Sequence, residues 1–209
     1  MLDLTDLSSG YGETQVLHGL SLRAEPGRVL AILGRNGAGK STTLKTIMGL
    51  LPARGGSVTF DGERISGLAP FDIAKRGIAY VPETRDIFRS LSVRENLDLA
   101  ARRFPCPKGG WTVERVIELF PRLGERLDNG GDQLSGGEAQ MLAIARRLLM
   151  SQSLLILDEP RERLAHAHRG THRAQRVVFM RLGQAEDGHD RVADVLLDLA
   201  AVPRDLGRH

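Results

Sequence analysis

The feature that most constrains the fold is a glycine-rich segment, GRNGAGKS, at residues 34–41. It matches the pattern G-x-x-x-x-G-K-[ST] at every fixed position. An apolar run of strand length, Val29–Leu33, precedes it, and apolar residues at helical spacing, Leu44, Ile47 and Met48, follow it. The sequence therefore predicts a buried parallel strand, a glycine-rich turn and a helix, in that order.

This order of elements gives the segment the chemistry of a triphosphate-binding loop. Backbone N–H groups, which glycine leaves accessible, can face phosphates, and the helix that follows adds the positive end of its dipole. We expect Lys40 to reach the β- and γ-phosphates and the Ser41 hydroxyl to ligate Mg²⁺. A chance glycine-rich turn is the alternative, but the flanking strand and helix favour nucleotide binding.

Length and composition limit the classes of protein that remain. The 209 residues suffice for one α/β domain, or for one with a small inserted subdomain. The chain has neither an apolar run of about eighteen residues nor the basic start of a signal peptide, so we expect a cytosolic protein. Its single cysteine, Cys106, excludes an internal disulfide and a cysteine-cluster metal site. The net charge of +3 does not by itself indicate a nucleic-acid partner.

The segments around the loop predict an antiparallel β layer. Residues 2–30 form short alternating segments separated by glycines, and Ser57–Phe60 has the pattern of a hairpin strand. Tyr11 lies between Gly10 and Gly12, where its ring can stack on a nucleotide base; an ordinary loop aromatic is the alternative.

Acidic residues follow two further strands. Glu83 comes after an apolar run at 77–82, and an acid at the carboxyl end of a parallel strand lies where open α/β sheets bind ligands. A surface glutamate is the alternative. The fully apolar run Leu154–Leu157 ends in Asp158 and Glu159. We expect Asp158 to orient Mg²⁺ through water and Glu159 to polarise the attacking water.

Between these strands the sequence predicts a helical subdomain, from about residue 86 to 147. Ser92-x-x-Glu95 is a capping box that opens a helix, and Thr112 opens another. Helices that follow one another without a strand, inserted between strands, indicate a separate subdomain.

A third motif starts at Ser135, where Ser135-x-x-Glu138 is again a capping box. Capping accounts for the serine and the glutamate but not for the glycines between them, Gly136 and Gly137. Two glycines at a helix start leave backbone N–H groups open to an anion.

Together these segments resemble the ATP-binding cassette (ABC) ATPases. GRNGAGKST at 34–42 is similar to the Walker A motif of that family, LSGGEAQ at 134–140 to its signature motif and LLILDEP at 154–160 to its Walker B motif. The signature is the specific element, because other phosphate-loop proteins lack it. The resemblance implies a P-loop NTPase α/β fold over residues 1–160, with an N-terminal antiparallel β layer and an inserted helical subdomain.

The resemblance also implies ligands and their residues. ATP and Mg²⁺ are the implied cofactors, with Tyr11 stacking on adenine and Glu83 in the Q-loop, which senses Mg²⁺ and the membrane partner. Ser41, Glu83 and Asp158 are the implied Mg²⁺ residues, and Glu159 is the catalytic residue. The implied nucleotide-binding residues are Tyr11, Gly34, Asn36, Gly37, Ala38, Gly39, Lys40, Ser41, Thr42, Glu83, Ser135, Gly136 and Gly137.

Residues 77–97, with Glu83 at the Q-loop position, are similar to an ATPase subunit of bacterial branched-chain amino-acid importers. This implies transmembrane permease subunits, a second ATPase subunit, identical or a sister, and indirectly a periplasmic solute-binding protein. It implies a peripheral protein at the cytoplasmic face of the inner membrane and no nucleic-acid partner. A cassette acting on DNA or ribosomes is the alternative, but there is neither a long coiled coil nor a second cassette.

From residue 161 to 209 the resemblance fails. Arg161 and Arg163 stand where the family's D-loop has small residues, and no switch histidine or glutamine has the right flanks. Val177–Met180 predicts a strand. This atypical tail, with the pattern of a shifted reading frame or a rearrangement, leaves a second interpretation open: a relative that binds nucleotide but is defective in hydrolysis.

Overall fold

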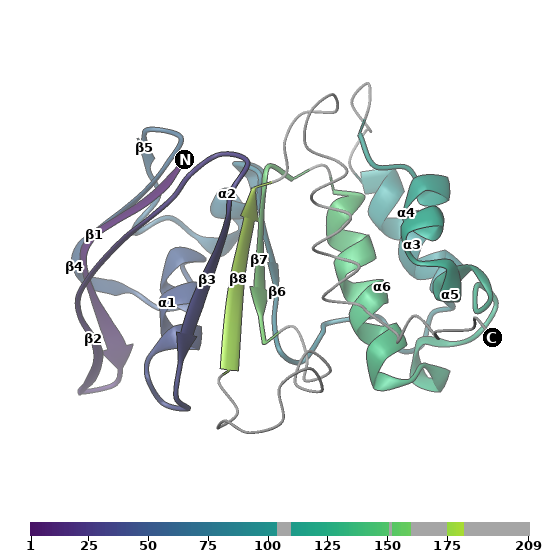
Figure 1. The fold of residues 1–209 in the computed structure, drawn as a ribbon, viewed down its shortest axis with the longest axis horizontal. Coiled ribbons are helices and arrows are strands. Elements are labelled where there is room, and N and C mark those ends of the chain that lie inside the picture. Colours follow the sequence, from purple (N-terminus) through teal and green to yellow (C-terminus); the bar gives the residue numbers. More distant parts are fainter. Residues whose placement is uncertain (104–109, 151, 160–174, 182–209) are drawn as a thin grey trace, which may run out of the picture. The chain divides into compact units, whose positions relative to one another are not determined.

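The computed structural model describes four stretches of the chain, residues 1–103, 110–150, 152–159 and 175–181 (Figure 1). Contacts between residues divide the chain into two units. The first contains residues 1–83, 152–159 and 175–181, with both β-sheets and two helices. The second contains the described part of residues 84–150 and is helical.

One sheet of the first unit is antiparallel throughout, in the order β2-β1-β4-β5. Its strands are β1 (Leu2–Tyr11), β2 (Thr14–Ala24), β4 (Ala53–Phe60) and β5 (Glu63–Arg64). The predicted β layer is thus confirmed, although β4 starts before the expected Ser57. Gly56 lies inside β4 at a register shift, where its φ is 73° and a Cβ would come within 2.3 Å of the Asp6 carbonyl oxygen. Glycine is required at this bulge.

The other sheet has the order β3-β8-β7-β6. Its strands are β3 (Val29–Gly34), β8 (Gln175–Arg181), β7 (Leu154–Asp158) and β6 (Ile78–Val81). Strands β6 and β7 are parallel, as expected from their apolar runs, while β8 is antiparallel to both β3 and β7. The predicted strand at 177–180 is confirmed by β8.

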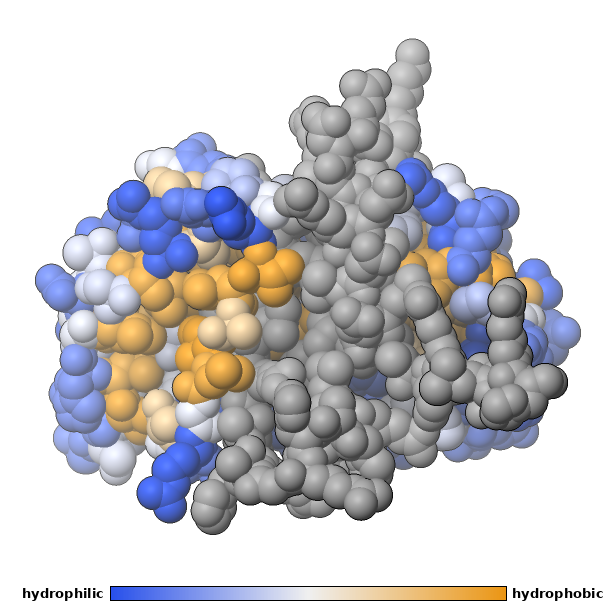
Figure 2. All heavy atoms as spheres, in the orientation of Figure 1, coloured by the Kyte–Doolittle hydropathy of each residue, from blue (hydrophilic) through white to orange (hydrophobic). Residues whose placement is uncertain are grey.

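The prediction of a buried parallel strand before the glycine-rich loop is wrong in two respects. The described neighbour of β3 is the antiparallel β8, and Val29 and Leu33 are 46% and 60% exposed. Because β3 alternates, Leu30 and Ile32 pack against the core while Val29, Ala31 and Leu33 face solvent. Apolar side chains are visible on this unit's surface in Figure 2. The apolar run therefore marks a strand with one buried face.

Helix α1 (Lys40–Ile47) joins the two sheets of the first unit into one core (Figure 1). It packs against β1, β2, β3 and β7. Its Leu44 and Ile47 are buried beside Leu4 of β1 and Ile156 of β7. Each such side chain stabilises the fold by about 1.5–3 kcal/mol. Helix α2 (Pro70–Lys75) packs against β6.

The second unit is built from α3 (Val93–Arg103), α4 (Val113–Leu119), α5 (Pro121–Gly124), the short 3₁₀ helix Gly131–Gln133 and α6 (Gly136–Leu148). Both predicted capping boxes are confirmed, at Ser92 with Glu95 and at Ser135 with Glu138. The buried Asn96 side chain bonds the backbone of Phe88 and Ser92 and so ties the preceding loop to α3. In the part of the chain that the structure describes, no helix has the length and apolar character needed to cross a membrane.

Candidate functional site

The glycine-rich loop connects β3 to α1, and its conformation depends on glycine. Gly37 and Gly39 have φ values of 82° and 89°, which other residues adopt only with strain. A Cβ on Gly39 would also lie 2.9 Å from the Leu17 side chain. Asn36 and Ala38 are exposed at the loop's tip, and the first N–H groups of α1 have no partner within the helix. The loop can therefore present several backbone donors to an anion.

Lys40, the first residue of α1, is only 6% exposed and folds back onto the loop. Its Nζ donates to the carbonyl oxygens of Gly34 and Arg35, at 2.9 and 2.7 Å. These acceptors are neutral, whereas phosphate oxygens would form stronger charge-assisted bonds. The positively charged Lys40 ammonium therefore lies where the phosphates of a nucleotide would bind.

Asp158, at the end of β7, lies beside this loop and is 3% exposed. Its Oδ1 accepts a hydrogen bond from Ser41 Oγ at 3.0 Å, and its Oδ2 accepts one from the Tyr80 hydroxyl at 2.9 Å. Two residues that the sequence suggested separately for Mg²⁺ are therefore in direct contact. The Ser41 hydroxyl could thus ligate Mg²⁺ directly, while the Asp158 carboxylate bonded to it could hold one of the waters that this ion usually keeps.

The two glutamates of the predicted site follow the parallel strands β6 and β7, as expected. Glu83 is exposed, and among the described residues it makes no hydrogen bond to Ser41 or Asp158. Glu159 is half-buried and has a φ of 49°. A non-glycine residue in this left-handed region costs of order 1–3 kcal/mol, and such strain concentrates at functional sites.

Sequence reasoning missed Tyr80, whose hydroxyl bonds Asp158 from the neighbouring strand β6. Burial, together with the Asp158 carboxylate, raises the pKa of Tyr80 above its ordinary value. The phenol therefore stays protonated and remains a donor at neutral pH. A hydroxyl within the otherwise apolar run 77–82 was the only signal available in the sequence.

Tyr11 ends β1 with its side chain 44% exposed. The ammonium of Lys45, from α1, lies 5.8 Å from the centre of its ring, within cation–π range. The ring is thus held near the helix that starts at Lys40 and remains accessible for stacking.

Ser135 caps α6 in the second unit. Its hydroxyl accepts from the Glu138 N–H at 3.3 Å, and its own N–H donates to Glu138 Oε2 at 2.8 Å. This second bond is the main reason why the pKa of Glu138 is lowered. At Gly137 an added Cβ would meet no described atom within 4 Å, and its φ is not in the left-handed region. The described chain therefore gives no reason for glycine at 137.

The profile of the ABC transporter family matches residues 17–162, a stretch that includes all three motifs. The chain belongs to the ABC transporter family. It is an ATP-binding cassette ATPase of the transport class, and the predicted P-loop NTPase fold is confirmed by solved cassettes of this family.

Curated relatives include subunits of different transport systems. The high-affinity branched-chain amino acid transport ATP-binding protein BraG of Pseudomonas aeruginosa is 43% identical over 162 residues, 77% of this chain and 69% of that protein. The probable branched-chain amino acid transport protein LivF of Archaeoglobus fulgidus is 37% identical, with 79% and 70% covered. The lipopolysaccharide export ATP-binding protein LptB of Haemophilus influenzae is also 37% identical, with 77% and 67% covered.

Solved structures of cassettes give a similar picture. A nucleotide-free ATP-binding cassette from an ABC transporter matches with a TM-score of 0.64 at 27% identity, over 78% of this chain and 70% of that one. The dimeric structure of a bacterial ABC transporter cassette matches with a TM-score of 0.64 at 26% identity, over 77% and 74%.

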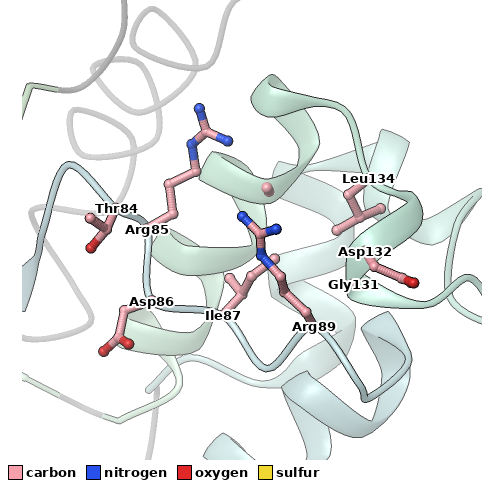
Figure 3. A pocket seen from close by; sticks show the side chains of 9 residues that line it. Thr84, Arg85, Asp86, Ile87, Arg89, Gly131, Asp132 and Leu134 are labelled. Atoms are coloured by element: carbon pink, nitrogen blue, oxygen red, sulfur yellow. The ribbon is translucent and has the colours of Figure 1, made fainter.

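The second unit of the cassette contains a cavity of about 290 Å³ (Figure 3). Figure 3 shows the guanidinium groups of Arg85 and Arg89 projecting from the segment after Glu83. The segment is held by α6, because Arg146 donates to the Asp86 carbonyl at 2.7 Å and Arg147 pairs with its carboxylate at 3.4 Å. The lining residues are Thr84, Arg85, Asp86, Ile87, Arg89, Gly131, Asp132, Leu134 and Ala139.

Several expectations for the tail lie outside the described residues. These concern Arg161 and Arg163 at the D-loop position and the missing switch residue. Within 161–209 the structure describes only the strand β8.

Proposed function

We propose that this chain is the ATP-hydrolysing subunit of a bacterial ABC importer for branched-chain amino acids. The observation that carries the proposal is the contact of Ser41 with Asp158 at 3.0 Å beside the buried Lys40. These residues lie far apart in the sequence, and together they offer a cation for phosphates and two oxygens for Mg²⁺.

Within this proposal, ATP binds along the glycine-rich loop, with its base on Tyr11 and its β- and γ-phosphates at Lys40. Ser41 would hold Mg²⁺ directly and Asp158 would hold it through a water, with Glu83 near it. When bound there, Mg²⁺ would neutralise charge on the phosphates, so that the γ-phosphoryl group passes to water and ADP departs. Glu159 orients the attacking water and accepts its proton.

The proposal includes a second ATPase subunit, identical or a sister. The signature segment Ser135–Gly137 of one subunit then contacts the ATP bound at the other's Lys40. The open space around Gly137 supports this arrangement, because a glycine that its own chain does not need can admit a ligand from outside. The solved structure of one similar bacterial cassette is described as dimeric.

The permease subunits, we propose, contact the cavity of the second unit. Arg85 and Arg89 line it, and the segment that carries them directly follows Glu83. A peripheral position at the cytoplasmic face of the membrane follows from this contact, with the periplasmic solute-binding protein as an indirect partner.

The sequence identities of 43% to BraG and 37% to LivF support branched-chain amino acids as the transported solute. Lipopolysaccharide is the second candidate, because LptB is also 37% identical. Complementation separates them: the chain is expressed in strains that lack either the LivF-type or the LptB ATPase. We expect restored leucine uptake in the first, whereas rescue of the second alone would select lipopolysaccharide export.

The alternative of a hydrolysis-defective relative rests on the atypical tail, in which no switch residue is recognisable and Arg161 and Arg163 stand at the D-loop position. Bulk and positive charge there would oppose the close approach of two subunits. Steady-state ATPase measurements on the full chain distinguish the two possibilities.

A further inference from the structure

Strand register places Tyr80 on the same face of the sheet as Asp158. Tyr80 of β6 pairs with Ile156 of the parallel strand β7, and Asp158 lies two residues beyond Ile156. Residues two apart in a strand point to the same face, so Tyr80 and Asp158 are diagonal neighbours. A tyrosine is long enough to span this diagonal, and its hydroxyl ends 2.9 Å from Asp158 Oδ2.

The two oxygens of Asp158 accept hydrogen bonds from two different elements. Ser41 of α1 donates to Oδ1, while Tyr80 of β6 donates to Oδ2. The carboxylate is 3% exposed, so little water is available to replace either donor. A phenylalanine at position 80 would fill the same space but leave Oδ2 without this bond, so that the bond from Ser41 alone would orient the carboxylate.

We infer that Tyr80 is a positioning residue, which orients the Asp158 carboxylate so that Oδ1 faces Ser41 at the Mg²⁺ site. The inference rests on the proposed function, because it takes Ser41 and Asp158 as the residues that hold the ion. Tyr80 acts through Asp158 and contacts neither the phosphates nor the metal. Its loss is therefore expected to affect the part of nucleotide binding that depends on Mg²⁺.

The test is an ATP titration of the full chain and of Tyr80→Phe, each in EDTA and in saturating Mg²⁺. In EDTA the two proteins should bind ATP with dissociation constants within about twofold of each other. In Mg²⁺ the variant should lose about tenfold in affinity, the lower end of the effect of removing a residue that orients a metal ligand. A thermal melt of both proteins confirms that the variant is folded.

A double-mutant cycle shows whether Tyr80 acts through Asp158. In an Asp158→Asn background, Tyr80→Phe should cause no further loss of the Mg²⁺-dependent affinity. An equal loss in EDTA and in Mg²⁺ would overturn the inference, as would an unchanged Mg²⁺ gain or additive losses in the cycle. If the parent binds no ATP in either buffer, the proposed function fails and the inference fails with it; if it binds, only the role of Tyr80 is decided.

Discussion

At the scale of single residues, Lys40 is the side chain on which ATP affinity should depend most. Its buried ammonium is held by two neutral carbonyl oxygens, and phosphates would replace these with charge-assisted bonds. Such bonds contribute about 1.5–3 kcal/mol each, so Lys40→Ala should weaken ATP binding by at least about tenfold to a hundredfold. Nucleotide titration measures this loss.

Lys45 on the same helix is the matched control for Lys40. Its ammonium lies over the exposed ring of Tyr11, where a cation–π contact contributes about 0.5–1 kcal/mol. Lys45→Ala should therefore change ATP affinity by no more than about fivefold. Equal losses in the two variants would contradict the assignment of Lys40 to the phosphates.

Gly137 offers a residue-scale test in which stability and assembly should change in opposite directions. Alanine there meets no described atom, and it is the better helix former by up to about 1 kcal/mol. We expect Gly137→Ala to raise the free energy of unfolding by a few tenths of a kcal/mol and to weaken ATP-dependent dimerisation. Urea denaturation and light scattering measure the two effects, and unchanged dimerisation would remove Gly137 from the proposed contact.

At the scale of elements, the start of α6 should depend on pH through Glu138. Its pKa is lowered from 4.5 in the folded state, chiefly by the bond from the Ser135 N–H. A carboxyl with a lowered folded pKa adds stability above its unfolded pKa and loses it as the pH falls through the folded value. Glu138→Gln keeps an acceptor for the cap but lacks the charge, so the parent should be more stable at pH 7 by a few tenths of a kcal/mol.

This difference in stability should shrink as the pH falls from 4.5 through the lowered pKa of folded Glu138, because the parent carboxyl then loses its charge as well. Urea denaturation of both proteins at pH 7 and near pH 3 tests the prediction. A difference that is the same at both pH values would show that the charge of Glu138 does not act at the cap.

An element could be predicted from the sequence when the interaction that forms it joins residues that are close together in the chain. Helix starts at Ser92, Thr112 and Ser135 were predictable, because a cap bonds a backbone group only three residues away. The one-sided burial of β3 and the antiparallel direction of β8 could not be predicted, because an apolar run does not indicate which strand lies beside it. Tyr80 was missed for the same reason, since its bond to Asp158 depends on the register of β6 against β7.

At the scale of the whole molecule, β8 connects the atypical tail to the sheet that carries the site. It pairs with β3 on one side and β7 on the other, so its loss would leave both with unpaired backbone groups. A chain that ends at residue 174 should therefore unfold without a cooperative transition or aggregate. A chain that ends at residue 183 keeps β8 and is the matched control; equal thermal melts for the two would contradict this role of β8.

The whole-molecule function was predictable from three short motifs, since each carries its chemistry in adjacent residues. The contact between the first and third motifs was not predictable, because Ser41 and Asp158 come together only through the packing of α1 on β7. The family match confirms the ABC ATPase, while the solute and the roles of single residues stay predictions.

The central claim is that this cassette hydrolyses ATP with Glu159 as the base, and turnover of the full chain beside Glu159→Gln tests it most directly. Removing the base alone should leave the ATP dissociation constant unchanged and lower the Mg²⁺-dependent turnover by about 10²–10⁴-fold. Turnover at the parent's rate in Glu159→Gln would contradict the claim. A parent that binds ATP but shows no turnover would contradict it too, and would support the hydrolysis-defective alternative.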